Sequence, residues 1–194
     1  MKKPVPGFLR TAGICGIFAP IIAFCAITVA ISISPWFSWE KNALSDLGAS
    51  PGSSVVFNSG LAIAGMLATA FSAGLFLGVN NRVGKAAAVL LMIDSLALIG
   101  IGVFPETAGE IHLLFSVIFF AIFPLFSLSF LVYSITQEWT KMAVLTLVSA
   151  AGAALPWTFR WRGVAIPETI SALFASLLTL TLAAILLKRG KVGR

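Results

Sequence analysis

Six long apolar stretches constrain this chain more than any other feature of its sequence. A helix needs about 20 predominantly apolar residues to cross a bilayer. The stretches lie at about residues 11–34, 55–79, 85–104, 111–135, 142–159 and 165–187. Only 10% of the 194 residues are charged, against about 25% in soluble domains. We therefore predict an all-α, polytopic membrane protein whose six transmembrane helices form one bundle and a single domain.

The basic residues predict the orientation of these helices, because cytoplasmic segments of membrane proteins carry an excess of lysine and arginine. With a cytoplasmic N-terminus, ten of the 13 basic residues lie on the inner side, namely Lys2, Lys3, Arg10, Arg82, Lys85, Lys141, Lys188, Arg189, Lys191 and Arg194. The outer side has Lys41, Arg160 and Arg162. We expect a multi-pass protein of the cell membrane with both termini cytoplasmic. Its basic tail suits contact with membrane lipids and not with nucleic acid.

The acidic residues gather at the opposite, outer ends of the helices. Five of the seven lie there, namely Glu40, Asp46, Glu106, Glu110 and Glu168, whereas Glu138 lies on the inner side and Asp94 within the membrane. The stretch FPETAGEIHLLF, residues 104–115, holds two of them together with the only histidine, His112. Two explanations fit this pattern. Carboxylates in the first turn of a helix complement its dipole, or the side chains line a polar site.

The second explanation predicts a polar pocket at the outer membrane face. A histidine beside a carboxylate suits proton transfer near neutral pH, so the candidate catalytic residues are His112, Glu106 and Glu168. The candidate ligand-binding residues are Ser45, Asp46, Asn58, Ser116 and Arg160. We expect the pocket to bind a lipid headgroup or a small molecule. The alternatives are a lipid-modifying enzyme with a His/Glu acid–base pair, and a small transporter or channel.

The longest connection, residues 35–54, is expected to carry a short interfacial helix. In SWEKNALSDLG, Ser38 is a suitable N-cap and Gly48 a suitable C-terminal stop. Trp36 and Trp39 suit the headgroup region of a bilayer. We expect this helix to lie on the outer surface and to cover the bundle as a lid.

Asp94 is the one acidic residue near the middle of a predicted span. A carboxylate at this depth is costly, and it marks either a functional site or a hydrogen-bonded anchor. Thr69, Ser72 and Ser127 are the candidate partners. Asp94 lies about 18 Å along the chain axis from Glu106, so we expect these two carboxyl groups to belong to different sites.

No metal or cofactor site is expected. Cys15 and Cys25 are about 15 Å apart along one predicted helix, which is too far for a disulfide. No Cys/His cluster has the spacing of a zinc site, and a single histidine excludes a three-histidine site. Small residues in 60–78 and in SAAGAAL, 149–155, allow helices to approach closely, and such faces would also suit a homodimer.

Short motifs spread along the chain resemble those of a known family. They are SDLG at 45–48, Asn58, GVFPE at 102–106, His112 and GxxxPE at 163–168. Over nearly its whole length the chain resembles the family called domain of unknown function 998, whose members are six-helix membrane proteins. The resemblance implies the six-helix fold and marks Ser45, Asp46, Asn58, Glu106, His112 and Glu168 at the outer face. It implies no reaction.

Overall fold

The computed structural model describes residues 6–190, and six long helices dominate it. They are α1 (Pro6–Ser32), α3 (Ser54–Gly78), α4 (Arg82–Val103), α5 (Glu110–Thr136), α6 (Thr140–Ala154) and α7 (Ala165–Arg189). The short elements are the helix α2 (Asp46–Ala49) and the 3₁₀ helices η1 (Glu106–Ala108) and η2 (Leu155–Thr158). Within the described residues there is no strand. Six segments, the fifth of which joins α6 to η2, are long and apolar enough to cross a membrane, which confirms the predicted fold class.

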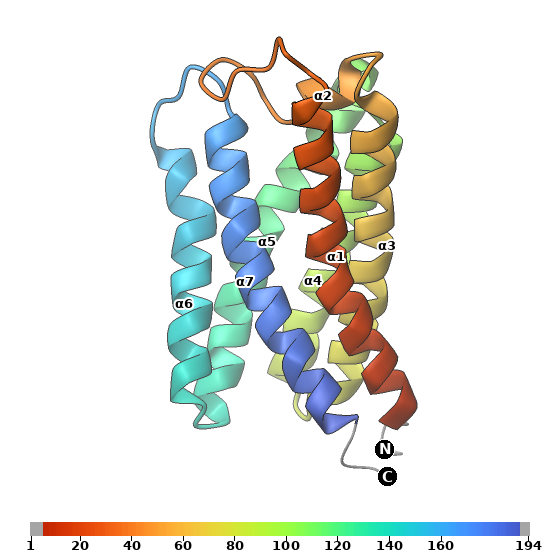
Figure 1. The fold of residues 1–194 in the computed structure, drawn as a ribbon. Helices are drawn as coiled ribbons and strands as arrows, with labels where there is room; N and C mark the ends of the chain where they lie inside the picture. The colour runs from red at the N-terminus through yellow and green to blue at the C-terminus, as the bar shows by residue number, and fades with distance from the viewer. Residues whose placement is uncertain (1–5, 191–194) are drawn as a thin grey trace.

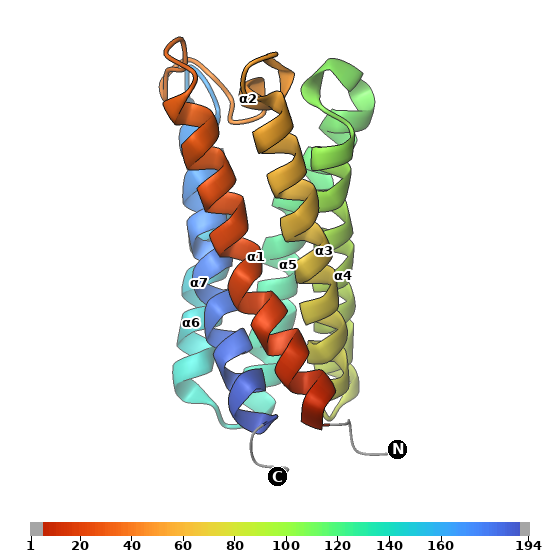
Figure 2. The same cartoon turned by 45° about the vertical axis from the view of Figure 1, so that its right-hand side comes forward.

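The six long helices form a closed ring (Figures 1 and 2). Each packs mainly against its neighbours in sequence, and α7 packs against α1 to close the ring. After α3 the connections are short, which explains the order of these helices, because short connections make consecutive helices antiparallel neighbours. The start of α1 and the end of α7 lie at one end of the bundle, and α2 lies at the other. We call these the terminal end and the α2 end.

The helix predicted for residues 38–48 is much shorter in the structure. Residues 38–45 form turns, and only α2, four residues long, is helical. Ser38 is therefore not an N-cap. Its backbone N–H instead donates to Asn42 Oδ1 (2.9 Å). The prediction of a short helix in this loop is correct, but polar side chains of the loop bond to its own backbone and replace most of the helix.

Two predicted spans also have different ends. The first helix begins at Pro6, before the predicted start at residue 11. The fifth helix ends at Ala154, because Pro156 lacks the N–H that would continue it, and the chain tightens into η2.

Close packing of α1 against α3 depends on glycine. A Cβ atom added to Gly60 would overlap Ala26, and one added to Gly74 would overlap Ala12. The small residues of α3 therefore allow close helix contact, as predicted. They are covered by α1 of the same chain, so this face is not free to contact a second copy.

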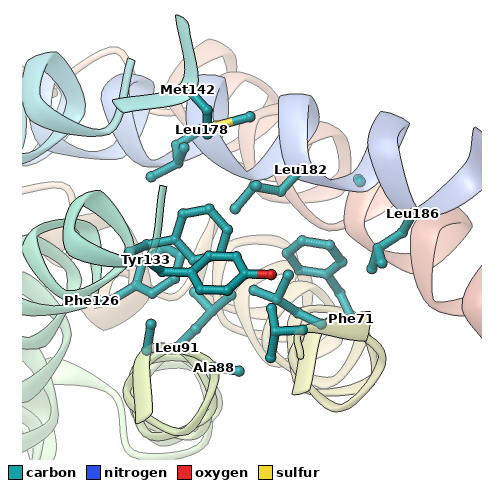
Figure 3. Close-up of a cluster of buried hydrophobic side chains, with 14 of the residues drawn as sticks. Phe71, Ala88, Leu91, Phe126, Tyr133, Met142, Leu178, Leu182 and Leu186 are labelled. Carbon is teal, nitrogen blue, oxygen red and sulfur yellow. The ribbon is translucent and has the colours of Figure 1, made fainter. Parts of the chain in front are cut away.

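Two clusters of buried apolar side chains fill the ring at different levels. The larger cluster occupies the terminal half and includes Phe71, Phe126, Phe130 and Tyr133. Figure 3 shows its side chains pointing toward one another from α3, α4, α5, α6 and α7. The smaller cluster lies at the α2 end and includes Leu44 and Leu47 from the loop before α3.

The described basic residues of the predicted inner side lie at the terminal end. They are Arg10, Arg82, Lys85, Lys141, Lys188 and Arg189. Lys2, Lys3, Lys191 and Arg194 lie outside the described residues. The structure thus places these six basic residues at the end opposite α2, and the side of the membrane that each end faces stays a prediction.

Candidate functional site

The α2 end of the bundle is covered by residues 42–48, which we call the roof. Leu44 and Leu47 anchor it, with 5% and 0% of their surface exposed. Asp46 fixes its shape, because its Oδ2 atom accepts hydrogen bonds from Asn42 Nδ2 (2.6 Å) and from the Ala43 N–H (3.0 Å). The roof is therefore a folded cap with apolar side chains turned inward, and it corresponds to the predicted lid.

Hydrogen bonds tie the roof to the start of α7. The Leu44 N–H donates to Glu168 Oε2 (2.6 Å), and the Ala165 N–H donates to the Asn42 carbonyl (2.9 Å). Gly163 allows this approach, since a Cβ atom there would overlap the backbone of Lys41 and Asn42.

The roof is also tied to the start of α3. Asn58 Nδ2 donates to the Gly48 carbonyl (2.9 Å), and the Ser53 hydroxyl donates to the Leu47 carbonyl (2.7 Å). A Cβ atom on Gly48 would overlap the Asn58 side chain. Two helices that lie far apart in sequence thus hold the two ends of the roof.

A cavity of about 120 Å³ lies beneath the roof, inside the ring. Five of the six long helices line it, all except α6. Along α7 the lining runs from Glu168 to Thr179, about 16 Å at the helical rise of about 1.5 Å per residue. Its floor consists of Phe71, Leu91 and Phe123, which belong to the large apolar cluster. The cavity therefore occupies the α2 half of the bundle and ends at the filled terminal half.

Most of the cavity wall is apolar, and its polar side chains lie at several depths. The polar lining residues are Ser45, Asp94, Ser95, His112, Ser116, Glu168, Ser176 and Thr179. No lysine or arginine is among the described residues that line it. The cavity thus combines apolar walls with carboxyl, hydroxyl and imidazole groups.

His112 has a defined tautomer. Its Nδ1 atom lies 2.7 Å from the Phe104 carbonyl oxygen, and the imidazole is buried, with 6% of its surface exposed. A carbonyl only accepts, so Nδ1 carries the hydrogen and a neutral ring presents Nε2 as an acceptor. Within residues 6–190, Nε2 has no hydrogen-bond partner. This nitrogen is available to a ligand in the cavity.

Glu168 is buried and uses one carboxyl oxygen. Its residue exposure is 8%, and Oε2 accepts the bond from the roof. The other oxygen, Oε1, has no hydrogen-bond partner among the described residues. Glu168 is thus placed both to hold the roof and to contact a molecule beneath it.

Asp94 lines the same cavity nearer its floor. It is 5% exposed, and its Oδ1 atom is buried without a partner in the described part of the chain. The expected hydroxyl partners bond elsewhere: Thr69 donates to the Gly65 carbonyl and Ser72 to the Thr69 carbonyl. Ser127 Oγ is itself buried without a partner. Within the described residues, Asp94 Oδ1 therefore has no hydrogen bond to any of these three hydroxyl groups.

Glu106 lies outside the cavity lining, close to the roof. Its Oε2 atom is buried without a hydrogen-bond donor. Burial raises the pKa of this carboxyl group, the facing Asp46 carboxyl raises the pKa further, and a hydrogen bond from Ser45 lowers it. Two carboxyl groups form a hydrogen bond only when one of them is protonated. Glu106 and Asp46 are thus a pair that favours holding a proton.

Comparison with known proteins places the chain in a family. Residues 17–185 match the family described as "Protein of unknown function (DUF998)". The chain belongs to the DUF998 family. The match spans every motif that carried the resemblance and confirms it. No curated protein and no solved structure matches this DUF998 chain.

The structure divides the predicted site residues of this DUF998 protein into two groups. Ser45, His112, Ser116 and Glu168 line the cavity, and Asp94 joins them there although it was expected to stand apart. The second group consists of Asp46, Asn58, Glu106 and Arg160, which do not line it. Asp46 and Asn58 hold the roof, and Arg160 is exposed and forms no ion pair with the described residues.

Two residues that hold the roof of this DUF998 chain, Asn42 and Leu44, were not predicted from the sequence. Asn42 bonds to both the start of the loop and α7, and Leu44 supplies the N–H that Glu168 accepts. The spacing of Asn42 and Asp46 is a usable signal, because side chains four residues apart can meet in a compact turn. Within residues 6–190, no group of three His, Cys, Asp or Glu side chains is placed to hold a metal ion.

Proposed function

We propose that this DUF998 protein binds an amphipathic small molecule or lipid in the cavity beneath the roof. The polar part of the ligand contacts polar side chains of the lining, and its apolar part lies against the apolar walls. The observation that carries this proposal is the cavity itself, whose apolar walls enclose free polar atoms under a cap made by a distant segment. Ligand pockets commonly combine apolar walls with a few convergent polar groups.

The filled terminal half favours binding over conduction. A channel needs a continuous polar path, whereas Phe71, Phe126 and Phe130 are buried in the cluster that closes the ring below the cavity. With the orientation that the basic residues predict, the cavity belongs to the outer half of a cell membrane and both termini are cytoplasmic. The ligand then enters from the outer side or the outer leaflet.

A second candidate function is an enzyme that modifies a lipid, and His112 is the observation that favours it. Its Nδ1 atom is held by the Phe104 carbonyl, and its Nε2 atom is free, which is the arrangement that a general base needs. Glu168 would act as the partner acid. Turnover of a membrane lipid extract that His112→Ala abolishes without loss of ligand binding would favour the enzyme, and equal loss of both would favour binding alone.

A cavity-filling variant tests the binding proposal. Ala175 lines the cavity, and Ala184 is an exposed residue of the same helix. Native mass spectrometry of the gently purified protein should show a retained small molecule or lipid. Ala175→Phe should lose it, and the matched control Ala184→Phe should keep it. The proposal fails if no species is retained, or if both variants retain it equally.

A further inference from the structure

Apart from His112, the ionisable side chains around the cavity are all acidic. Two carboxyl groups, those of Asp94 and Glu168, line it, and no described lysine or arginine does. The Asp46 and Glu106 carboxyl groups lie at the roof, close enough to Glu168 to disfavour a negative charge on it. A ligand with a phosphate or carboxylate group would therefore find no lysine or arginine in the described lining, while a cation would find carboxyl groups to pair with.

Asp94 is the carboxyl group of the lining that a cationic ligand would stabilise most. It is buried, it lines the cavity, and its Oδ1 atom has no donor among the described residues. A buried polar atom without a partner costs free energy, and a buried charge costs more. Glu168, by contrast, already accepts the hydrogen bond from Leu44. An ammonium group offers three N–H donors and a compensating charge.

The depth of Asp94 defines the shape of the ligand. Counted from Val103, the last residue of α4, Asp94 lies about 14 Å into the bundle, and Glu168 lies about 5 Å below Ala165. The wall between these levels includes Leu98, and Phe119 and Phe120 lie near the level of Asp94. Aromatic faces accept both alkyl chains and cations. A linear molecule with a nitrogen at its inner end fits this arrangement.

We infer that the cavity selects aliphatic amines, whose ammonium group pairs with Asp94 while the alkyl chain lies along the apolar wall toward the roof. This inference rests on the proposed function, because it names the chemical class of the ligand for the same cavity. It assigns to Asp94 the recognition of charge, and to the roof residues the contact with the other end of the molecule.

Three probes of equal chain length test the inference on the unaltered protein. Radiolabelled octylamine, octanol and octanoate are added to the protein in phosphatidylcholine nanodiscs, and binding to protein-free nanodiscs is subtracted. Octylamine should bind about tenfold or more tightly than octanol, since hydrogen bonds to charged groups are the stronger ones, and octanoate should bind most weakly. Octanol or octanoate binding as tightly as octylamine would overturn the inference.

Asp94→Asn then locates the selectivity. It keeps the shape of the side chain and removes its charge, so it should weaken octylamine by about tenfold or more and leave octanol nearly unchanged. Glu110→Gln is the control, because Glu110 is an exposed acid outside the cavity lining, and it should change neither. Selectivity for the amine that survives in Asp94→Asn contradicts the assignment to Asp94.

The two proposals fail in different ways. If all three probes bind equally and Ala175→Phe blocks them all, the cavity binds amphipathic molecules and only the inference about amines is wrong. If no probe binds the unaltered protein above the nanodisc background, the inference about amines is wrong, and the binding proposal falls with it only if native mass spectrometry also shows no retained species.

Discussion

The backbone N–H of Leu44 donates a hydrogen bond of 2.6 Å to Glu168 Oε2, and this bond joins two residues that are 124 positions apart. It connects the roof to α7 directly above the cavity. Both groups are buried, so the bond is shielded from water and its loss leaves an unpaired backbone donor. The roof is thus held by a side chain that also faces the cavity.

Glu168→Ala should loosen the roof. Loss of a buried bond of this kind should lower the free energy of unfolding by about 1–3 kcal/mol and speed hydrogen–deuterium exchange at the Leu44 amide. Glu168→Gln keeps an acceptor oxygen and should restore part of the protection. Glu110→Ala removes an exposed acid in the first turn of α5 and serves as the control. Unchanged exchange at Leu44 in Glu168→Ala would show that this bond does not hold the roof.

Gly163→Ala should displace the roof from α7. Its Cβ atom would overlap the backbone of Lys41 and Asn42, whereas nothing lies within 4 Å of a Cβ atom added to Gly52. Forcing atoms into a packed contact costs about 1–3 kcal/mol. Thermal unfolding in detergent should show a lower midpoint for Gly163→Ala than for Gly52→Ala. Equal midpoints would mean that the loop adapts to the added atom without strain.

Acidic pH should stabilise the protein through Glu106. Its pKa in the folded state is raised above its ordinary value of 4.5 by burial and by the Asp46 carboxyl. The folded state therefore binds the proton more tightly than the unfolded chain does. This contribution to stability is complete below the ordinary pKa, and it is lost as the pH rises through the raised folded-state pKa.

Glu106→Gln should remove that part of the pH dependence and raise the unfolding midpoint at neutral pH. The measurement is the unfolding midpoint as a function of pH, with Glu40→Gln as the control because Glu40 is exposed in the same part of the molecule. A Glu106→Gln curve parallel to that of the unaltered protein would remove the carboxyl pair from the account.

Cysteine labelling tests the orientation predicted from the basic residues. Cys15 and Cys25 are first replaced by alanine, and a single cysteine is then placed at Gly52 near α2 or at Thr140 near the terminal end, both exposed. In intact cells a membrane-impermeant maleimide should label Gly52→Cys and not Thr140→Cys. The opposite pattern would place the cavity on the cytoplasmic side.

The six spans were predictable because each depends only on a local run of apolar residues, which lipid requires of any crossing helix. A lid was expected at the position of the roof, but its conformation was not predictable. The turns and α2 depend on hydrogen bonds with Glu168 and Asn58, which lie far away in sequence. In residues 38–48, side-chain bonds of Asn42 and Asp46 to the loop's own backbone, together with these distant contacts, replace the longer helix that was predicted.

The cavity was predictable only in part. His112 and Glu168 were identified because the few ionisable residues of this apolar chain gather at the outer ends of the helices, and Ser116 because it lies four residues after His112. The sequence gives the depth of Asp94 along its helix but not the direction that its side chain faces, so its place in the same cavity could not be foreseen. For the same reason, the sequence could not show that the Asp46 and Glu106 carboxyl groups lie at the roof and outside the cavity lining.

A crystal structure of the protein grown from a lipid mesophase, without added ligand, tests the central claim most directly. The account predicts elongated density that is not protein beneath Leu44, running past His112 and Ser116 toward Asp94. A cavity whose walls have closed upon one another, with the Asp94 carboxyl bonded to a neighbouring side chain and no room between the helices, would contradict it.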